Sequence, residues 1–497
     1  MLQRIENTEK EADLFDTITF VEPPATQSER VALLWKRGVL LEASGSSDDA
    51  RQTWIALLSL EPSHLGALNR LGGLLAAAGE NGLAREVFAE AVARHPADPM
   101  SRVNLANVLI KNDAHEEARL HLEDALRVDA DFRPAHAGLA FVLNRLGKTE
   151  LAMRHGRIAF QGQPLVEARY RGDAEPIRVL ELISTRGGNV RIQNFLSDHI
   201  FQRYLVTAEF YDPTVPLPEH QLVVNAIGDA DVAGAALAGA EAVLARTTAP
   251  VINRPAAVLA TGRASVAGRM SAVPGVVTAR TATVSRGLLE SPQAEAALGR
   301  LGFGFPLLFR SPGFHGGEHF LRLDSAAELP TALDSLPGRE LLAIEYLDAR
   351  SNDGKIRKYR VMTIDGLLYP LHCAVSSNWK IHYFSAEMAD NAMHRAEDAA
   401  FLADMPMVLG TRVMAALSAI QNALGLDYGG IDFGIHRNGD LLLFEANATM
   451  VILPPGAEAK WDYRRPAVER VCRAVHAMLI GRAGRGETVS VAHAQSL

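Results

Sequence analysis

Cysteine is scarce in this chain of 497 residues, which contains only Cys373 and Cys472. Two cysteines cannot form a disulfide framework, and these two are not spaced as a CxxC metal-binding pair. Long apolar runs are also missing, since the stretch from Val232 to Leu244 is short and broken by glycine and alanine. The N-terminal residues are charged throughout, unlike a signal peptide. We therefore expect a cytoplasmic protein from a reducing compartment.

Positive charge is not in excess, because 50 lysines and arginines stand against 58 aspartates and glutamates, a net charge of −8. This balance argues against binding to nucleic acid or to an anionic membrane, both of which need a positive surface. No convincing Ser/His/Asp or Cys/His set for nucleophilic catalysis is present either. Hydrophobic residues make up 48% of the chain, as in an ordinary globular protein, and the length predicts about three domains.

A repeat with a period of 34 residues fills the first third of the chain. Small residues recur with this period in three columns, bulky residues in a fourth that Gly156 breaks, and turn residues in a fifth. The columns are Gly38, Gly72, Ala106, Ala140; Ala50, Ala84, Ala118, Ala152; Leu57, Ala91, Ala125, Ala159; Trp54, Phe88, Leu122; and Gly79, Asp113, Gly147. Small residues let two helices approach closely, so each repeat is predicted to be a helix–turn–helix unit.

This pattern resembles the tetratricopeptide repeat (TPR), with about four units from residue 31 to 166 after an N-terminal segment at 1–30. The resemblance implies an all-α solenoid with a concave surface that holds a peptide or another protein. A dimerisation or spacer array is the alternative. Asn69, Asn104 and Asn107 lie on the expected inner helices and are candidates for gripping a peptide backbone.

A small α/β domain is predicted at 176–262. The runs at 177–183, 221–225 and 250–253 have the β-type composition of strands, and 233–246 reads as an alanine-rich helix. Strands that alternate with helices favour a parallel sheet. Gly187 and Gly188 follow the first strand and could cradle a phosphate, although a plain turn is the simpler interpretation.

The last 235 residues contain three segments whose residues are suited to ligand binding or catalysis. The first is an expected strand, 305–310, that ends in Arg310 and runs into the glycine-rich loop 311–317, whose backbone N–H groups could close over phosphates. The second is the expected strand 340–347, followed by a strand on which Lys358 and Arg360 share one face and by a hairpin turn at 365–366.

The third segment is the most specific. Two expected strands, 428–435 and 441–447, form a hairpin that brings Asp432 beside Glu445 and Asn447. Three hard oxygen ligands at one end of an apolar hairpin predict a Mg²⁺ site with room for nucleotide phosphates. The alternative for Glu445 is a salt bridge to an arginine.

In this order the three segments resemble the ATP-grasp superfamily over roughly 250–480, with an ATP-grasp domain at 263–480 and a flexible tail at 481–497. The resemblance implies ATP and Mg²⁺ as cofactors, with Asp432, Glu445 and Asn447 as the metal ligands. The implied nucleotide-binding residues are Arg263, Arg310, Ser311, Gly313, His315, Gly316, Gly317, Glu345, Tyr346 and Leu347. Two of these depart from the family, because arginine replaces the usual phosphate-binding lysine at 263 and at 310.

The implied catalytic residues lie where the γ-phosphate would meet the carboxylate that receives it. Lys358 and Arg360 would face the γ-phosphate, and the segment 376–382, expected to alternate as a strand, would add Lys380 and His382. His372 is a further candidate that is more simply a packed residue. The sequence after Asn447 departs from the family pattern, which affects the expected substrate pocket.

The resemblance implies a ligase that activates a carboxylate as an acyl phosphate and joins it to an amine. A TPR array suggests that one substrate is a peptide or protein. A kinase on the same fold and a TPR scaffold with a degenerate nucleotide site are the alternatives, and a homodimer is left open.

Overall fold

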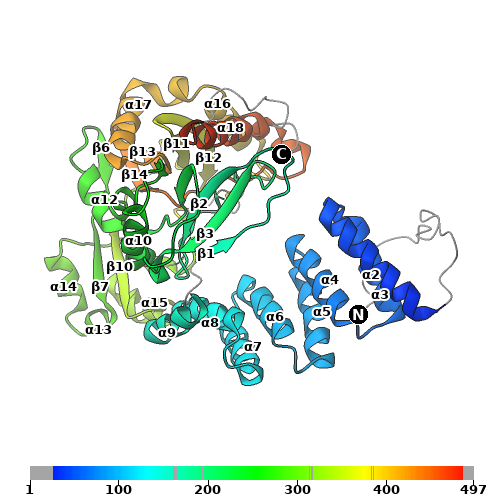
Figure 1. Cartoon of the computed structure of the whole chain (residues 1–497). Helices are drawn as coiled ribbons and strands as arrows, with labels where there is room; N and C mark the ends of the chain where they lie inside the picture. Colours follow the sequence, from blue (N-terminus) through cyan, green and yellow to red (C-terminus); the bar gives the residue numbers. More distant parts are fainter. Residues whose placement is uncertain are drawn as a thin grey trace. The chain divides into compact units, whose positions relative to one another are not determined.

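The structure is a computed structural model that describes residues 26–160, 165–192, 195–312, 314, 317–381, 383 and 386–484. The chain divides into two compact units, Met1–Gln161 and Gly162–Leu497. The first contains the blue and cyan helices of Figure 1, and the second contains all the strands.

Four helical hairpins joined in series make up the described part of the first unit. Their helices are α2 (Gln27–Ser44), α3 (Ser47–Leu60), α4 (Leu65–Ala77), α5 (Asn81–Arg94), α6 (Pro99–Lys111), α7 (His115–Val128), α8 (Arg133–Arg145) and α9 (Thr149–Phe160). The predicted helix–turn–helix repeat is confirmed. The helices begin at Gln27, earlier than the predicted residue 31, and end at Phe160, before the predicted residue 166.

The turn column marks the place where each hairpin reverses. Gly79, Asp113 and Gly147 all adopt positive φ angles, of 81°, 57° and 73°. Glycine adopts this left-handed conformation without a steric penalty, and aspartate tolerates it better than most residues. The 34-residue period therefore arises from a need for positive φ at the turn column and from side-chain packing at the other columns.

Glycines in the first column allow aromatic rings of the second helix to approach. A Cβ atom at Gly38 would lie 2.5 Å from the ring of Trp54, and one at Gly72 would lie 2.6 Å from the ring of Phe88. Trp54 is fully buried and Phe88 nearly so. In these two hairpins, α2–α3 and α4–α5, a large ring thus fills the space left by a missing side chain.

The second unit begins with a five-stranded sheet in the order β1-β3-β2-β4-β5. Its strands are β1 (Leu165–Glu167), β2 (Ile177–Ile183), β3 (Phe201–Thr207), β4 (Leu222–Asn225) and β5 (Val251–Ile252), with helix α10 (Ala230–Leu244) after β4. All neighbours are parallel except β1 and β3. The parallel sheet and the helix are confirmed, whereas β1 and β3 were missed; β1 includes the last two residues assigned to the repeats.

Two largely antiparallel sheets follow. One has the order β7-β10-β8-β9, with β7 (Thr281–Ser285), β8 (Leu307–Arg310), β9 (Phe320–Leu323) and β10 (Glu340–Glu345). The other has the order β12-β11-β13-β14-β6, with β6 (Val276–Thr278), β11 (Ile356–Ile364), β12 (Leu367–Ser376), β13 (Tyr428–Ile435) and β14 (Leu441–Asn447). Both predicted hairpins are confirmed. In the β11–β12 turn Asp365 and Gly366 have φ angles of 47° and 79°, as a two-residue hairpin turn requires.

The remaining helices of the second unit are short, except for three in the C-terminal part. They are α11 (Pro255–Leu259), α12 (Arg263–Met270), α13 (Arg286–Leu289), α14 (Ala294–Arg300), α15 (Leu329–Ser335), α16 (Ala392–Ala403), α17 (Met405–Leu424) and α18 (Arg465–Arg482). These segments alternate with the strands, so the predicted fold class, a helical-repeat solenoid followed by α/β structure, is confirmed.

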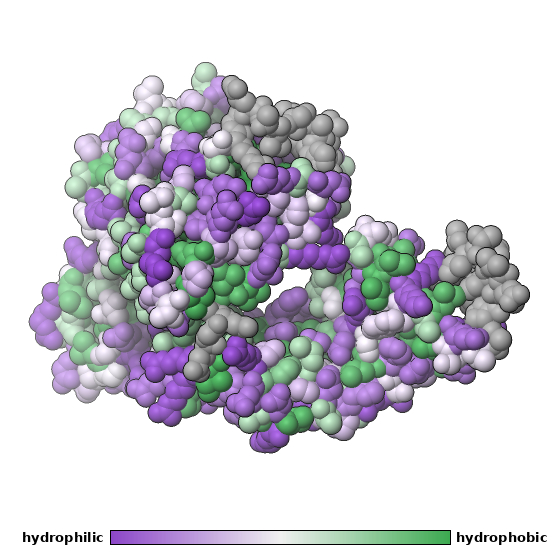
Figure 2. All heavy atoms as spheres, viewed as in Figure 1, coloured by the Kyte–Doolittle hydropathy of each residue, from purple (hydrophilic) through white to green (hydrophobic). Residues whose placement is uncertain are grey.

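Helix α17 alone, among the described residues, is long and apolar enough to cross a membrane by length and composition. Its apolar side contributes to the main core of the second unit through Leu409, Val413, Leu417 and Ile420. In the view of Figure 2, hydrophilic residues cover much of both units and apolar residues form scattered patches. The apolar composition of α17 is therefore explained by its packing against the sheet.

Two neighbouring glycines of α4 test the ring-to-glycine packing. We expect Gly72→Ala to destabilise the repeats by about 1–3 kcal/mol, because its Cβ meets Phe88. Gly73→Ala is the matched control: nothing lies within 4 Å of its Cβ, so alanine should stabilise the helix by up to about 1 kcal/mol. Urea unfolding followed by circular dichroism measures both. Equal midpoints for the two variants would contradict the packing described above.

Candidate functional site

One cavity of about 670 Å³ collects most of the predicted site residues. Its walls come from β8 and β10 of one antiparallel sheet, from β11, β12 and β14 of the other, and from the loop after β2. The predicted residues that line it are Arg263, Arg310, Gly317, Glu345, Tyr346, Leu347, Lys358, Arg360, Lys380 and Glu445. Residues from separate sheets, far apart in the sequence, are thus brought to one site.

Asp432 lies at the centre of a buried cation cluster behind the cavity wall. Its side chain is fully buried and accepts two hydrogen bonds from Arg360, Nε–Oδ1 at 2.6 Å and Nη2–Oδ2 at 2.8 Å. Lys358 Nζ lies 2.7 Å from the same Oδ2. Burial alone would raise the pKa of Asp432, but these two cations outweigh it and hold the pKa below its usual value. The shared face predicted for Lys358 and Arg360 is confirmed.

Glu445 lies directly opposite Asp432 on the neighbouring strand and belongs to a second charge network. Its Oε1 accepts hydrogen bonds from Arg263 Nη2 at 3.0 Å and from Asn447 Nδ2 at 2.9 Å. Burial would raise the pKa of Glu445, but Arg263 and Arg310 lower it below its ordinary value. The alternative interpretation of Glu445, an ion pair with an arginine, therefore describes this structure, and Asp432 is paired in the same way.

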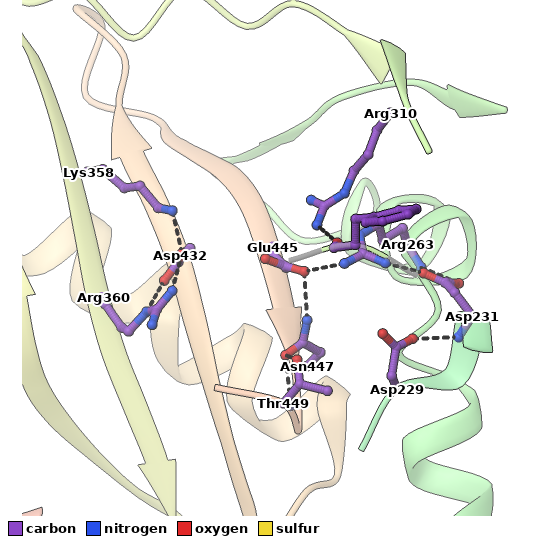
Figure 3. Close-up of polar contacts among 11 residues, drawn as sticks. Asp229, Asp231, Arg263, Arg310, Lys358, Arg360, Asp432, Glu445, Asn447 and Thr449 are labelled. Carbon is purple, nitrogen blue, oxygen red and sulfur yellow. Dashed lines mark hydrogen bonds and ion pairs between the residues drawn. The ribbon is translucent and has the colours of Figure 1, made fainter. Parts of the chain in front are cut away.

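Arg263 bridges two carboxylates, as Figure 3 shows. Its Nη1 lies 2.7 Å from Asp231 Oδ2, while Nη2 reaches Glu445. Burial opposes the charge, but the surrounding carboxylates, Glu445 foremost, raise the pKa of Arg263. Arg310 has no carboxylate within salt-bridge distance among the described residues, and burial together with Arg263 lowers its pKa. Arg310 is thus the cation of this pair that is available to an anionic ligand.

Sequence analysis missed Asp229 and Asp231, which start helix α10. Asp229 caps the helix, since its Oδ1 accepts a hydrogen bond from the Asp231 backbone N–H at 2.9 Å. Gly188 packs against this turn, where a Cβ would lie 2.6 Å from the Cβ of Asp229. Two aspartates ahead of an alanine-rich helix are a recognisable capping signal. What the sequence could not reveal is that this helix start lies next to Arg263.

Asn447 is buried beside Glu445, and its Oδ1 accepts two hydrogen bonds from Thr449, from N at 2.9 Å and from Oγ1 at 2.8 Å. The three predicted metal ligands therefore lie together on the β13–β14 hairpin. Their side chains already have protein partners, with one exception: Glu445 Oε2 accepts no hydrogen bond from the part of the chain that the structure describes.

The segment expected to meet adenine follows β10. Glu345 is fixed by Arg280, whose backbone N–H donates to Glu345 Oε2 at 3.0 Å. Arg322 lies over the ring of Tyr346, 4.3 Å from its centroid. Within the described residues, the backbone N–H groups of Tyr346 and Leu347 donate no hydrogen bond to the protein. Both residues line the cavity, so these donors are available to a ligand.

Apolar side chains form the other part of the cavity wall. Those from the two antiparallel sheets are Leu308, Ile344, Ile356, Leu371, Leu443 and Phe444. Together with the free N–H groups after β10, they offer a flat heteroaromatic ring both apolar contact and backbone hydrogen bonds.

The predicted phosphate-binding loop can be followed only in part. Gly313, His315 and Gly316 lie outside the described residues, as does His382. Ser311 is buried and its hydroxyl donates to Pro337 O at 2.7 Å, so it turns away from the cavity. A Cβ at Gly317 would lie 2.8 Å from Lys380 Cε, which brings this loop against Lys380.

Lys380 lines the cavity, but not in the way the sequence predicted. Strand β12 ends at Ser376, and residues 377–380 form bends and no strand, so the expected alternation along 376–382 is wrong. Lys380 Nζ donates to Phe320 O at 3.2 Å. His372 also lines the cavity, where burial and then Arg360 hold its pKa well below the usual value, so the ring is neutral at pH 7.

The cavity is strongly cationic even though the chain is acidic. Among the described residues, seven cationic side chains line it, against two carboxylates, Glu345 and Glu445. The cations are Arg191, Arg263, Arg310, Lys358, Arg360, Lys380 and Arg464. A wall of this kind attracts a ligand with several negative charges.

Comparison with known proteins returned structures but no family. No family model and no curated protein matches the chain. Over the helical repeats the matching structures include MamA from Desulfovibrio magneticus RS-1, at 24% identity, with 26% of this chain and 74% of that chain covered and a TM-score of 0.25.

Over the rest of the chain the matching structures include two ligases. The VanG D-Ala:D-Ser ligase from Enterococcus faecalis is 13% identical. The match covers 62% of this chain and 100% of the ligase chain, with a TM-score of 0.39. The D-alanine-D-alanine ligase from Coxiella burnetii is 10% identical. That match covers 63% of this chain and 96% of the ligase chain, with a TM-score of 0.40. At these scores neither likeness carries weight for function. What the structure itself shows is a unit of tandem helical hairpins followed by an α/β unit, and the case for an activity rests on the cavity.

Replacing Asp432 tests the buried cluster. We expect Asp432→Asn to lower the free energy of unfolding by about 3–5 kcal/mol at pH 7, because Arg360 and Lys358 lose their buried counter-charge. The lowered pKa of Asp432 stabilises the fold above the unfolded-state pKa of about 3.9, and this contribution is lost as the pH falls through the folded-state pKa. The cost of the substitution should therefore shrink in strong acid.

The matched control is Asp440→Asn, at the turn of the same hairpin, where the partner Arg412 is 60% exposed. An ion pair of this kind contributes about 1 kcal/mol or less. Chemical denaturation at several pH values measures both variants. The buried ion pairs of Asp432 would be contradicted if both variants lost similar amounts of unfolding free energy. They would also be contradicted if the loss in Asp432→Asn did not depend on pH.

Proposed function

We propose that the protein is an ATP- and Mg²⁺-dependent ligase that activates a carboxylate as an acyl phosphate and joins it to an amine. The observation that carries this proposal is one cavity in which seven cations of the described residues and an apolar wall (the apolar slot) lie next to the facing carboxylates Asp432 and Glu445. An adenine nucleotide has the matching parts, a flat apolar ring and a chain of negative charges.

The nucleotide would bind with adenine against the apolar slot, where the backbone N–H groups of Tyr346 and Leu347 are available. Its phosphates would lie toward Arg310 and Arg263, with the loop that includes Gly317 above them. Because Arg263 is shared by Asp231 and Glu445, Arg310 would supply the less compensated charge. The predicted residues Ser311, Gly313, His315, Gly316 and Glu345 stay proposals for this part of the site.

Magnesium would be held at the β13–β14 hairpin. Carboxylate and amide oxygens are the ligands that Mg²⁺ prefers, and Glu445 presents an unused Oε2 to the cavity. Both oxygens of Asp432 bind protein cations, so its participation requires Lys358 or Arg360 to turn toward the substrate. We propose Glu445 as the first ligand, with Asp432 and Asn447 beside it. When bound, the ion would supply positive charge that offsets the charge of the phosphates.

The reaction needs positioning and charge neutralisation more than a protein nucleophile. A substrate carboxylate would attack the γ-phosphate, releasing ADP, and an amine would then attack the acyl carbon and release phosphate. Lys358, Arg360 and Lys380 are the cations placed to neutralise the equatorial oxygens of the transferred group, and His382 is proposed beside them. The absence of a Ser/His/Asp or Cys/His set in the sequence agrees with this chemistry.

A peptide or protein substrate is proposed from the helical repeats, because tandem hairpins form a surface that commonly binds extended peptides. Tethering would make a weak affinity sufficient by raising the effective concentration. Asn104 Nδ2 donates to Asn69 Oδ1 at 3.0 Å, so these two asparagines are partly engaged with each other. A cytoplasmic location and a homodimer remain proposals of the same kind.

Product analysis with Mg-ATP tests the function. Peptides and acids are screened with amines, D-alanine and D-serine included, while ADP and free phosphate are measured. A ligase releases both only when a carboxylate and an amine are present together. A phosphorylated product without free phosphate would instead support a kinase, and no Mg-nucleotide affinity at all would leave a scaffold.

Glu445→Gln tests the metal ligand. We expect turnover to fall about 100-fold or more, since the amide cannot supply the charge that binds the cation. The control Glu340→Gln removes an exposed carboxylate at the start of β10 and should leave turnover unchanged. Unchanged turnover in Glu445→Gln would remove the metal assignment without touching the fold.

A further inference from the structure

Arg464 is a buried cation in the cavity wall that makes no hydrogen bond to the residues that the structure describes. Only 5% of the residue is exposed, and its guanidinium donates to no acceptor within the described residues. Asp398 is the nearest carboxylate, but Nε–Oδ2 is 3.8 Å, beyond hydrogen-bond distance. Buried polar groups in proteins are nearly always hydrogen-bonded. A guanidinium left in this state on a cavity wall therefore points to a ligand.

Asp398 cannot supply the missing bonds, because other donors occupy it. Its Oδ1 accepts from the Cys373 backbone N–H at 2.6 Å, and its Oδ2 accepts from the hydroxyls of Tyr463 at 2.8 Å and Tyr383 at 3.0 Å. Asp398 thus balances the charge of Arg464 at a distance, and the N–H donors of the guanidinium find no acceptor in the described part of the chain.

His372 is the second polar side chain of this kind. It is 7% exposed, lines the same cavity, and its Nδ1 has no partner among the described residues. Both groups pack on one ring: the Arg464 Cζ atom lies 4.1 Å from the Tyr383 ring centroid, and the centroids of His372 and Tyr383 are 4.7 Å apart. The ring of Tyr383 thus holds Arg464 and His372 together at one end of the cavity.

This end of the cavity adjoins the proposed reaction centre. His372 is the direct cross-strand partner of Arg360, so their Cβ atoms are about 5 Å apart. The carboxylates of this region, Asp398 and Asp432, are fully buried behind the wall. The surface offered to a ligand is therefore cationic, one strand spacing away from Arg360.

We propose that Arg464 and His372 form a binding site for the α-carboxylate of a free amino acid, which is the amine substrate. The inference rests on the proposed ligase function. A guanidinium fork fits a planar carboxylate with two hydrogen bonds, and a neutral imidazole adds a third. In an α-amino acid a single carbon separates the amine from the carboxylate. An amino acid held here would place its amine close to an acyl phosphate at Arg360, whereas the amine of a peptide carries no adjacent carboxylate.

Thermal unfolding of the full chain with Mg²⁺ and a non-hydrolysable ATP analogue tests the site. Each of the twenty amino acids and the available D-enantiomers is compared with its own amide, and succinate and glutarate are included. We expect at least one amino acid to raise the unfolding temperature above the value with nucleotide alone, and its amide to have no effect. Equal responses to acid and amide, a response to the dicarboxylates only, or no response to any amino acid would overturn the proposal.

Variants then assign the effect to Arg464. Arg464→Met should weaken the amino-acid response by roughly 30-fold or more while the nucleotide response remains. Arg473→Met, which removes an exposed arginine of α18, is the matched control and should keep both responses. An unaltered amino-acid response in Arg464→Met would contradict the proposal.

Should Arg464→Met not fold, Arg464→Lys preserves the charge beside Asp398 but lacks the fork, and should weaken the response about tenfold or more. Full affinity in Arg464→Lys would overturn the proposed geometry. Loss of the nucleotide response in the unmodified chain is a separate result, which would contradict the ligase function itself.

Discussion

A row of charged and polar groups across four strands is the constraint on which the site depends. Cross-strand pairing places His372, Arg360, Asp432 and Glu445 side by side on β12, β11, β13 and β14. Two carboxylates that face each other in a buried sheet repel, and each is costly without a counter-charge. The cations around them are therefore a condition of folding. They are also the groups that a polyphosphate would attract, so the charges that stabilise the folded sheet can also serve a ligand.

The row divides the cavity into two chemical regions. On the side of Glu445, Arg263 bridges carboxylates from a helix start and from β14, and Arg310 has no carboxylate partner among the described residues. On the side of His372, the buried Asp398 balances the charge of Arg464 from beyond hydrogen-bond distance. Both regions therefore favour anionic ligands.

Local patterns of the sequence predicted the parts of this arrangement that depend on period and turn chemistry. The 34-residue repeat predicted the helical hairpins because columns of small residues let two helices approach closely, as Gly38 does where it faces the ring of Trp54. Period-two alternation placed Lys358 and Arg360 on one face, and the turn residues predicted the hairpin that carries Asp432. These features are encoded within a few residues or within one repeat, where propensity and sterics act directly.

The partners across the cavity could not be predicted in this way. Arg263 and Glu445 are 182 residues apart, and the register that sets Arg360 against Asp432 joins strands separated by two helices. Nothing in the local sequence around Arg464 distinguishes it from Arg465, yet the first is buried against Tyr383 and the second bonds Asp462 at the surface. Segment 376–382 shows the converse. Its polar residues alternate as they would in a strand, but residues 377–380 form bends. The chemistry of the site is therefore set by tertiary pairing, which local sequence patterns do not encode.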